Sequence, residues 1–208
     1  MAPELLGLYL LRDGATGLSG GRIVEVEAYG GPDDRASHAR AGLTARTASM
    51  FGPPGHAYVY LVYGLHHCLN VVTETDGRAG AVLIRALEPV IGIDLIRLRR
   101  ERPHEPDFRL AAGPARLCQA LAIDRRLDGI DLCAGERLWL SRAPGDSAGD
   151  EPPAAAGSAA IVSGRRVGVE YAGEEWAARA WRFGLAGHPS LSRAFPRAAQ
   201  AATSAPAT

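Results

Sequence analysis

Lysine is missing from this 208-residue sequence, and all 23 basic residues are arginine. The absence excludes a Schiff-base lysine, a phosphate-binding lysine of a P-loop and a lysine general base. Acidic residues also number 23, so the formal net charge at neutral pH is zero. A neutral chain has no overall attraction for polyanions, although a local arginine surface is compatible with this balance.

Cysteine and long apolar runs are also scarce. The three cysteines, Cys68, Cys118 and Cys133, form no CxxC pair, so neither a disulfide framework nor a thiolate zinc site is expected. No run of about 18 apolar residues occurs, which argues against a transmembrane helix. The first residues lack the basic region and cleavage pattern of a signal peptide, so a cytoplasmic location is expected. A 47% hydrophobic content excludes disorder of the whole chain.

Two apolar segments at the start, residues 5–11 and 22–29, are separated by a glycine-rich stretch and are typical of a β-hairpin. Alternation along the second strand predicts that Ile23, Glu25, Glu27 and Tyr29 share one face. A long polar loop follows at residues 30–56, and a connection of this length is usually functional. Two carboxylates and an aromatic ring are therefore expected on one face of a strand that leads into a loop of the length found at functional sites.

A second hairpin is predicted from β-rich runs at residues 57–63 and 67–72, with Tyr63 close to its tip. Residues 81–87 form a further strand, and strands are expected at 137–140 and 166–169. Helical periodicity predicts a helix over 89–102, and Gly113-Pro114 can start another. We expect a flexible loop at about 143–160 and a flexible tail at 196–208. The hydrophobic runs continue without a linker, which indicates one α+β domain over residues 1–195.

Glu27 is the first candidate for chemistry. A single strand glutamate is usually solvated, but Glu27 is expected on the same face as Tyr29, beside a long loop. A carboxylate next to aromatic surface is desolvated, which raises its pKa and suits proton transfer. Glu25 is either a second member of a carboxylate pair or an outward-facing residue further down the strand. The outward position is favoured.

A metal site is the alternative use of these residues. Glu25, Glu27 and His38 could act as mixed carboxylate and imidazole ligands. No HExxH or similarly constrained spacing supports this, and the adjacent His66 and His67 point to opposite faces of a strand. Metal binding is therefore not favoured.

Three tyrosines mark the second hairpin. Tyr58 and Tyr60 share one face of the strand, where cross-strand packing is an equally good explanation for Tyr58. Tyr63 stands beside Gly64 at the turn, with little local core to fill. A protruding aromatic residue can wedge between stacked bases. Arg85 and Glu88, near the end of the 81–87 strand, could form surface ion pairs, and Arg85 could instead reach a phosphate.

With these residues assembled, the sequence resembles the alkyladenine (3-methyladenine) DNA glycosylase family. Three highly specific blocks carry the resemblance, together with a fourth and a weaker fifth block, in a fixed order over nearly the whole chain. They are RIVEVEAYGGPDDRASHA (22–39), MFGPPGHAYVYLVYGLHHCLNVV (50–72), AVLIRALEP (81–89), GPARLCQALAI (113–123) and RRVGVEYAGEEWAARAWRF (165–183).

The resemblance implies a single α+β domain with a curved antiparallel β-sheet, flanking helices and a protruding β-hairpin. It implies an enzyme that flips a damaged purine from double-stranded DNA and hydrolyses its N-glycosidic bond. Glu27 would be the general base that activates water. Tyr29, His38 and Tyr60 would form the walls of the base pocket. Asn70 would lie at the pocket floor and discriminate against the amino group of guanine.

Other residues take roles from the same blocks. Tyr63 would fill the gap left by the flipped nucleotide, and Arg85 would lie near the water and the target phosphate. The backbone carbonyl of Val167 would help to hold the water. Met50 and Arg116 are expected to contact DNA. No cofactor or metal is implied, and monomeric action is the simpler expectation.

The absence of lysine also bears on the subclass. Glycosylases that cleave the backbone form an imine through an amine, so a monofunctional enzyme that leaves an abasic site is predicted. Two alternatives stay open: a catalytically silent nucleic-acid-binding module, and a metal-dependent hydrolase built from Glu27 and His38. The arginines of residues 97–102 could be a solvated helix face or a phosphate track. The N-terminal extension that family members often carry is expected to be short.

Overall fold

The computed structural model describes residues 1–144 and 160–196. Within these ranges the chain forms an antiparallel sheet of eight strands with a few short helices, which confirms the α+β class. The strands are β1 (Tyr9–Gly14), β2 (Gly17–Tyr29), β3 (Ala57–Val62), β4 (His66–Val72), β5 (Ala81–Ile91), β6 (Leu138–Ser141), β7 (Ile161–Gly164) and β8 (Arg182–Leu185). The α-helices are α1 (Ile93–Arg100), α2 (Asp107–Leu110), α3 (Pro114–Ala120) and α4 (Glu174–Ala177). The 3₁₀-helices are η1 (Pro3–Leu5), η2 (His38–Ala41), η3 (Ala48–Phe51), η4 (Arg125–Leu127) and η5 (Glu170–Ala172).

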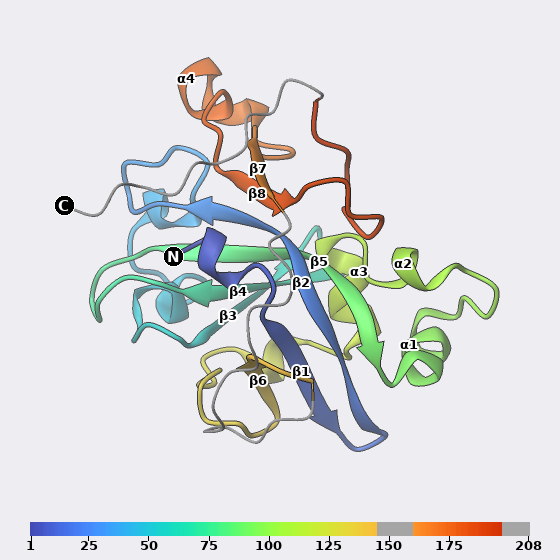
Figure 1. Cartoon of the computed structure of the whole chain (residues 1–208). Coiled ribbons are helices and arrows are strands. Elements are labelled where there is room, and N and C mark those ends of the chain that lie inside the picture. Colours follow the sequence, from blue (N-terminus) through green and yellow to red (C-terminus); the bar gives the residue numbers. More distant parts are fainter. Residues whose placement is uncertain (145–159, 197–208) are drawn as a thin grey trace.

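The long strand β2 organises the sheet (Figure 1). One of its edges pairs with β5 from Gly20 to Tyr29, and its other edge pairs first with β1 and then, from Glu25 to Glu27, with β8. The main strand order is β3-β4-β5-β2-β1-β6, and β7 lies on the far side of β8. The end of β2 is therefore enclosed by strands on both sides.

The hairpin β3–β4 projects beyond its neighbours and confirms the second predicted hairpin. Val62 pairs with His66, so the turn consists of Tyr63, Gly64 and Leu65. Tyr63 and Gly64 both have positive φ, 51° and 71°, a conformation that glycine adopts readily and tyrosine does not. The sharp turn places a strained tyrosine at the tip.

Helices α1, α2 and α3 gather beside β5 in Figure 1, and α3 contacts both β4 and β5. Helix α3 begins with Pro114 at its first position, where the missing backbone N–H costs nothing. Its buried face, which includes Leu117 and Cys118, joins the main core formed by β2, β3, β4 and β5. These helices therefore support the strands that carry the hairpin.

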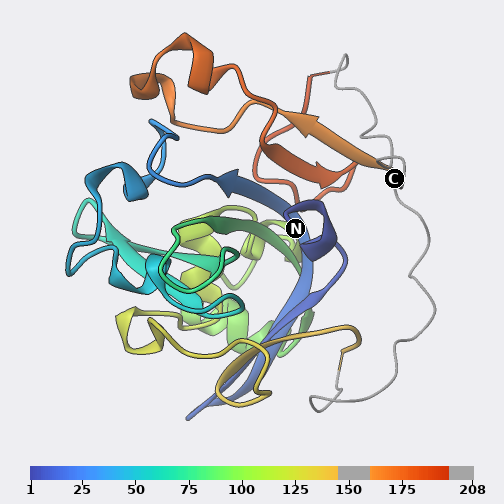
Figure 2. The same ribbon diagram turned by 90° about the vertical axis from the view of Figure 1, so that its left-hand side faces the viewer.

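Two segments meet over the end of β2: the loop of residues 30–56 and the chain around η5 and α4. Figure 2 shows both on the same side of the molecule. Ala36 packs with Val169 and Ala172, and the Asp34 carboxylate is paired with the Arg166 guanidinium, at 2.6 Å, where both side chains are buried. The contact closes a wall around Tyr29.

Several predicted elements need correction. The predicted helix over 89–102 is wrong at its start, because β5 continues to Ile91 as a partner of Gly20 and the helix begins at Ile93. Residues 166–169 do not form a strand; β7 and β8 supply the late strands instead. The first strand begins at Tyr9 rather than residue 5, and most of its predicted glycine-rich turn is paired strand.

The predicted faces of β2 are also partly wrong. Register shifts on either side of Glu25 place Ile23 and Val26 in the same core cluster. Most of the predicted flexible loop at 143–160, and all of the tail at 196–208 except Pro196, lies outside the described residues. Among the helices of the described ranges, none is long and apolar enough to cross a membrane.

Candidate active site: a buried carboxylate behind an aromatic pocket

A cavity of about 400 Å³ opens at the end of β2, which is within the size range of small-molecule sites. Its walls come from β2, β3, β4, β5, the 30–56 loop and the segment after β7. Of the sequence-predicted site residues, those that line it are Tyr29, His38, Met50, Tyr60, Tyr63, Asn70, Arg85 and Val167. Segments far apart in the sequence thus supply one pocket.

Glu27 lies directly behind this wall and is fully buried, with 0% of its surface exposed. The Tyr29 hydroxyl donates to its Oε2 at 3.0 Å, and the Val167 backbone N–H donates to its Oε1 at 2.7 Å. The Arg85 guanidinium lies 3.1 Å from Oε2. All three partners also face the cavity, so the carboxylate is one side chain away from any bound molecule.

The pKa of Glu27 is raised above its ordinary value because burial disfavours the charged form. The Arg85 charge, the Val167 amide and the Tyr29 hydroxyl oppose this rise without cancelling it. A carboxylate with a raised pKa is a stronger base than an exposed glutamate. The predicted desolvation of Glu27 beside an aromatic ring is therefore present in the structure.

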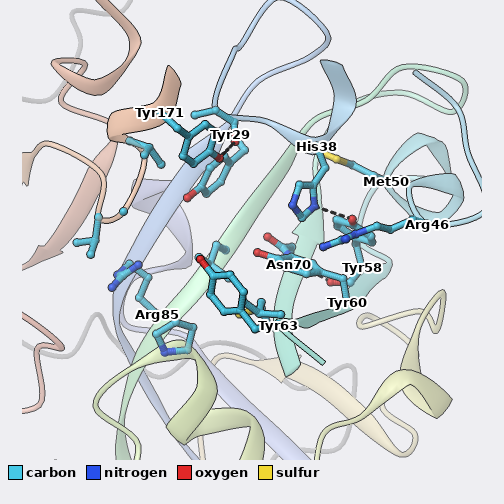
Figure 3. Close-up of a pocket in the computed structure, with 18 residues that line it drawn as sticks. Tyr29, His38, Arg46, Met50, Tyr58, Tyr60, Tyr63, Asn70, Arg85 and Tyr171 are labelled. Atoms are coloured by element: carbon cyan, nitrogen blue, oxygen red, sulfur yellow. Dashed lines mark hydrogen bonds between the residues drawn. The ribbon is translucent and has the colours of Figure 1, made fainter. Parts of the chain in front are cut away.

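The aromatic walls face one another across the cavity, with Tyr29 on one side and His38 and Tyr60 on the other (Figure 3). The ring centres of His38 and Tyr60 are 4.5 Å apart in an edge-to-face arrangement. His38 Nδ1 shares a hydrogen bond of 2.9 Å with the Tyr58 hydroxyl, which fixes the imidazole ring. Burial, together with the Arg46 charge, lowers the pKa of His38, so the imidazole is neutral near pH 7.

Asn70 lies on β4, lines the cavity and is 3% exposed. Its Nδ2 donates to the backbone carbonyl of Tyr58 at 3.0 Å, which fixes the orientation of the amide. Burial raises the pKa of Tyr58 to about 12, so its hydroxyl stays protonated. The cavity wall therefore includes a neutral amide whose orientation is fixed.

Tyr63 is 93% exposed at the rim of the cavity. Its positive φ carries a conformational cost of the order of 1–3 kcal/mol. An exposed ring does not repay that cost through packing. The combination of strain and exposure indicates a functional position.

Arg85 and Glu25 differ from their expected surroundings. Arg85 is 6% exposed and bridges the two carboxylates of β2, so it forms no surface ion pair. Burial alone would lower the pKa of Arg85, but the charges of Glu27 and Glu25 raise it. Glu25, predicted as an outward residue, is 0% exposed, because Arg85 from β5, Arg182 from β8 and Ser192 of the following segment contact its carboxylate.

The two residues expected to contact DNA lie in different surroundings. Met50 is 2% exposed and packs in the pocket wall with Tyr58. Arg116 lies on α3 with a side chain that is 47% exposed, 3.9 Å from Glu105. A contact of either residue with DNA stays a prediction.

Sequence reasoning missed three residues around the pocket. Arg46 lines the mouth with its guanidinium 5.6 Å from the Tyr60 ring centre. Tyr171 lines the rim, and its hydroxyl donates to the Ala36 carbonyl at 3.0 Å. Arg166 packs behind Tyr29, 4.8 Å from the ring centre. Arg46 lies in the long loop, and the other two residues lie in the fifth sequence block. Their positions in these two segments are the only sequence features that could have indicated them.

Metal ligation finds no support in the geometry. Within the described residues, no three histidine, cysteine, aspartate or glutamate side chains are grouped to hold an ion. His38 contacts Tyr58 and Tyr60 instead of Glu27. The proposed metal set of Glu25, Glu27 and His38 is therefore not assembled.

The fold and the site define an α+β protein that holds a buried carboxylate behind a pocket for a flat aromatic group. The sequence model of the methylpurine-DNA glycosylase (MPG) family matches residues 1–189. The chain belongs to this family: it is a DNA glycosylase, a hydrolase of N-glycosyl bonds that acts in the repair of alkylated purines.

Individual relatives agree with the family match. A protein from Anaeromyxobacter dehalogenans that is named as a 3-methyladenine DNA glycosylase is 50% identical to this chain over 202 residues. The match covers 97% of this chain and 83% of the relative. A protein of the same name from Methanocella arvoryzae is 44% identical over 199 residues, which cover 94% of this chain and 91% of the relative. The human DNA-3-methyladenine glycosylase is 41% identical over 201 residues, with 92% of this chain and 63% of the human protein covered.

Proposed function

We propose that this chain flips alkylated or deaminated purines out of double-stranded DNA and hydrolyses the N-glycosidic bond with a water molecule activated by Glu27. Residues 1–195 would form the catalytic domain, acting as a monomer without a metal or cofactor. One observation carries the proposal: the Glu27 carboxylate is fully buried, and three of its neighbours line a cavity with aromatic walls.

The walls suit a flat purine. Stacking on aromatic side chains contributes about 1–3 kcal/mol per base, which offsets the few kcal/mol needed to unstack and unpair the nucleotide. A purine methylated at N3 or N7 is cationic and gains roughly 0.5–2 kcal/mol more from Tyr29 and Tyr60. A neutral His38 contributes surface without repelling this charge. The names of the relatives, 3-methyladenine DNA glycosylases, support an alkylated purine as substrate.

Water activation follows from the acceptor capacity of Glu27. A carboxylate offers about four lone-pair positions. Tyr29 and Arg85 use Oε2, and Val167 uses one position of Oε1, which leaves Oε1 one position for a water proton. In this proposal the Val167 carbonyl helps to hold the same water, while Arg85 stabilises the carboxylate. An alkylated base is an activated leaving group, so general base catalysis of about 10²–10⁴-fold can suffice.

Tyr63 takes the place of the extruded nucleotide in this proposal. Apolar side chains that wedge between base steps unstack them and kink the duplex. A ring that is 93% exposed, beside the cavity mouth, is available for that role before DNA binds. Because the chain has no lysine, release of the base leaves an intact abasic strand.

The test is a time course of base release from duplexes that each carry one lesion: 7-methylguanine, hypoxanthine or ethenoadenine, with methylated DNA as the source of 3-methyladenine. The reactions contain EDTA. We expect release of at least one alkylated purine, and a loss of about 10²–10⁴-fold in Glu27→Gln. Binding to lesion duplex should be largely retained in this variant. Glu88→Gln is the matched control, since Glu88 pairs with Arg22 outside the pocket. Full activity of Glu27→Gln, or activity that EDTA removes, would contradict the proposal.

A further inference from the structure

Glu25 accepts from four donor atoms, one more than Glu27, and like Glu27 it lies behind the cavity wall. Its Oε1 accepts from Arg85 Nε at 2.9 Å, from Arg182 Nη1 at 3.3 Å and from the Ser192 hydroxyl at 2.8 Å. Its Oε2 accepts from the Ser192 backbone N–H at 2.5 Å. A fully buried carboxylate with four donors is a rigid point of the structure.

Arg85 connects this point to the site. Its Nε is bound to Glu25, and its Nη1 lies 3.1 Å from Glu27 Oε2. Its Nη2 donates to the Ser192 hydroxyl at 3.2 Å. A planar guanidinium held at three nitrogens has a single orientation. We propose that Glu25 and Ser192 are positioning residues for the hydrolysis: together they hold Arg85 in the orientation that serves Glu27. This inference rests on the proposed function of Glu27.

Ser192 belongs to the last described segment, which wraps around the end of β8. Arg182, on β8, donates to the Ala194 carbonyl at 3.1 Å, and its guanidinium lies 3.9 Å from the Phe195 ring centre. Ser192 lies just beyond residues 1–189, which the family model matches. The segment after β8 thus reaches the carboxylate that orients the catalytic arginine, although it contributes nothing to the cavity wall.

The charges of the cluster balance: Glu25 and Glu27 face Arg85 and Arg182. The other titratable groups around Glu27 are Tyr29 on β2 and Cys68 on β4, both neutral near pH 7 because burial raises their pKa values. In Glu25→Gln, two cations therefore remain against one carboxylate. The pKa of Glu27 should fall, and the acid limb of the rate–pH profile should move to lower pH.

The first experiment compares two serine variants of the same segment. Ser192→Ala removes the hydroxyl that contacts Glu25 and Arg85. Ser190→Ala is the matched control, because its hydroxyl is buried without a hydrogen-bond partner among the described residues. Single-turnover release of 3-methyladenine from methylated duplex DNA should slow roughly tenfold in Ser192→Ala, below the ~10²-fold that a misplacement of about 1 Å can cost. Affinity for a duplex with a tetrahydrofuran abasic-site analogue should stay within about twofold of wild type. Equal rates for the two variants would overturn the inference.

The second experiment records the rate–pH profile of Glu25→Gln. The acid limb reports the charge around Glu27, and the plateau above it reports how well Arg85 is held. A limb that moves to lower pH together with a lower plateau supports the inference. A plateau equal to that of wild type overturns it. Glu27→Gln and wild type are measured alongside. If wild type releases base and Glu27→Gln does not, the proposed function stands, whatever the outcome for Glu25 and Ser192.

Discussion

The backbone N–H of Val167 donates to the Glu27 carboxylate at 2.7 Å, across 140 positions of sequence. The bond joins the central strand β2 to the segment after β7, and it orients the carboxylate against the aromatic pocket. Because the contact comes from the main chain, substitution of the Val167 side chain leaves it in place. The proposed general base is therefore held by the main chain as well as by side chains.

The rate of base release should depend on pH through Glu27. Burial raises its pKa above the ordinary value of 4.5, and only the deprotonated form accepts a proton from water. Single-turnover rates should therefore rise with pH along a limb whose midpoint lies above 4.5. The limb should be absent from the residual activity of Glu27→Gln, which separates it from a titration of His38, whose pKa burial lowers. A rate that is constant down to pH 4 would argue against Glu27 as the base.

Replacement of Glu27 should also change stability in a pH-dependent way. A group whose pKa is raised by folding stabilises the protein below its unfolded pKa, and this contribution is lost as the pH rises through the folded pKa. Wild type should therefore lose stability relative to Glu27→Gln between acid and neutral pH. Denaturant unfolding at pH 4 and pH 7 measures the difference. If the free energy of unfolding of wild type, minus that of Glu27→Gln, increased from pH 4 to pH 7, the result would contradict a raised pKa of Glu27.

Tyr63 offers a test that separates function from stability. Tyr63→Gly and Tyr63→Ser both remove the ring, but only glycine adopts the positive φ of this position without strain. Both variants should bind lesion duplex more weakly, and the glycine variant should be more stable than the serine variant by about 1 kcal/mol. Leu98→Ser is the control, since Leu98 is exposed on α1. Unchanged affinity in both Tyr63 variants would exclude the wedge role.

Asn70 should limit which purines enter. Its amide is fixed by the Tyr58 carbonyl and cannot turn to accommodate the amino group of guanine. Asn70→Ala should raise the release of 7-methylguanine relative to 3-methyladenine, at a stability cost of about 1 kcal/mol for the lost hydrogen bond. Competition between the two lesions in one methylated DNA sample gives the ratio. An unchanged ratio would remove Asn70 from the specificity determinants.

The absence of lysine leads to a chemical test. Borohydride reduces an imine between an amine and the sugar to a stable bond, and this chain offers no lysine amine to form one. We expect no covalent protein–DNA adduct after treatment during turnover. The product strand should break only after alkali. A borohydride-trapped adduct would show that the enzyme also uses its α-amine.

Local patterns in the sequence predicted the parts of the site that depend on one segment. The alternation of Tyr58 and Tyr60, and the turn at Tyr63, follow from strand and hairpin rules, and the structure confirms them. Glu27 beside Tyr29 is another local relationship, and the two side chains are hydrogen-bonded. The resemblance to a family supplied the roles that no local pattern gives.

The sequence predictions are wrong or incomplete at residues whose surroundings are set by segments far away in the sequence. Glu25 is polar on a strand, and its burial depends on side chains that β5, β8 and the segment after β8 bring onto it. Ile23 changes face because of register shifts, which leave no mark in the alternation itself. Arg46 lies in the long loop and Tyr171 in the one-turn helix η5, where no alternation or helical periodicity indicates which side chains face the pocket.

The path of the chain after β8 limits how many C-terminal residues can be removed from this enzyme without loss of contacts to Glu25 and Arg182. A protein that ended at residue 189 would still contain every residue that the family model matches. It would nevertheless leave Glu25 without both of its Ser192 donors and Arg182 without its carbonyl acceptors. Truncation should therefore be planned from the hydrogen bonds beneath the pocket, because the family match ends before Ser192, which holds Glu25.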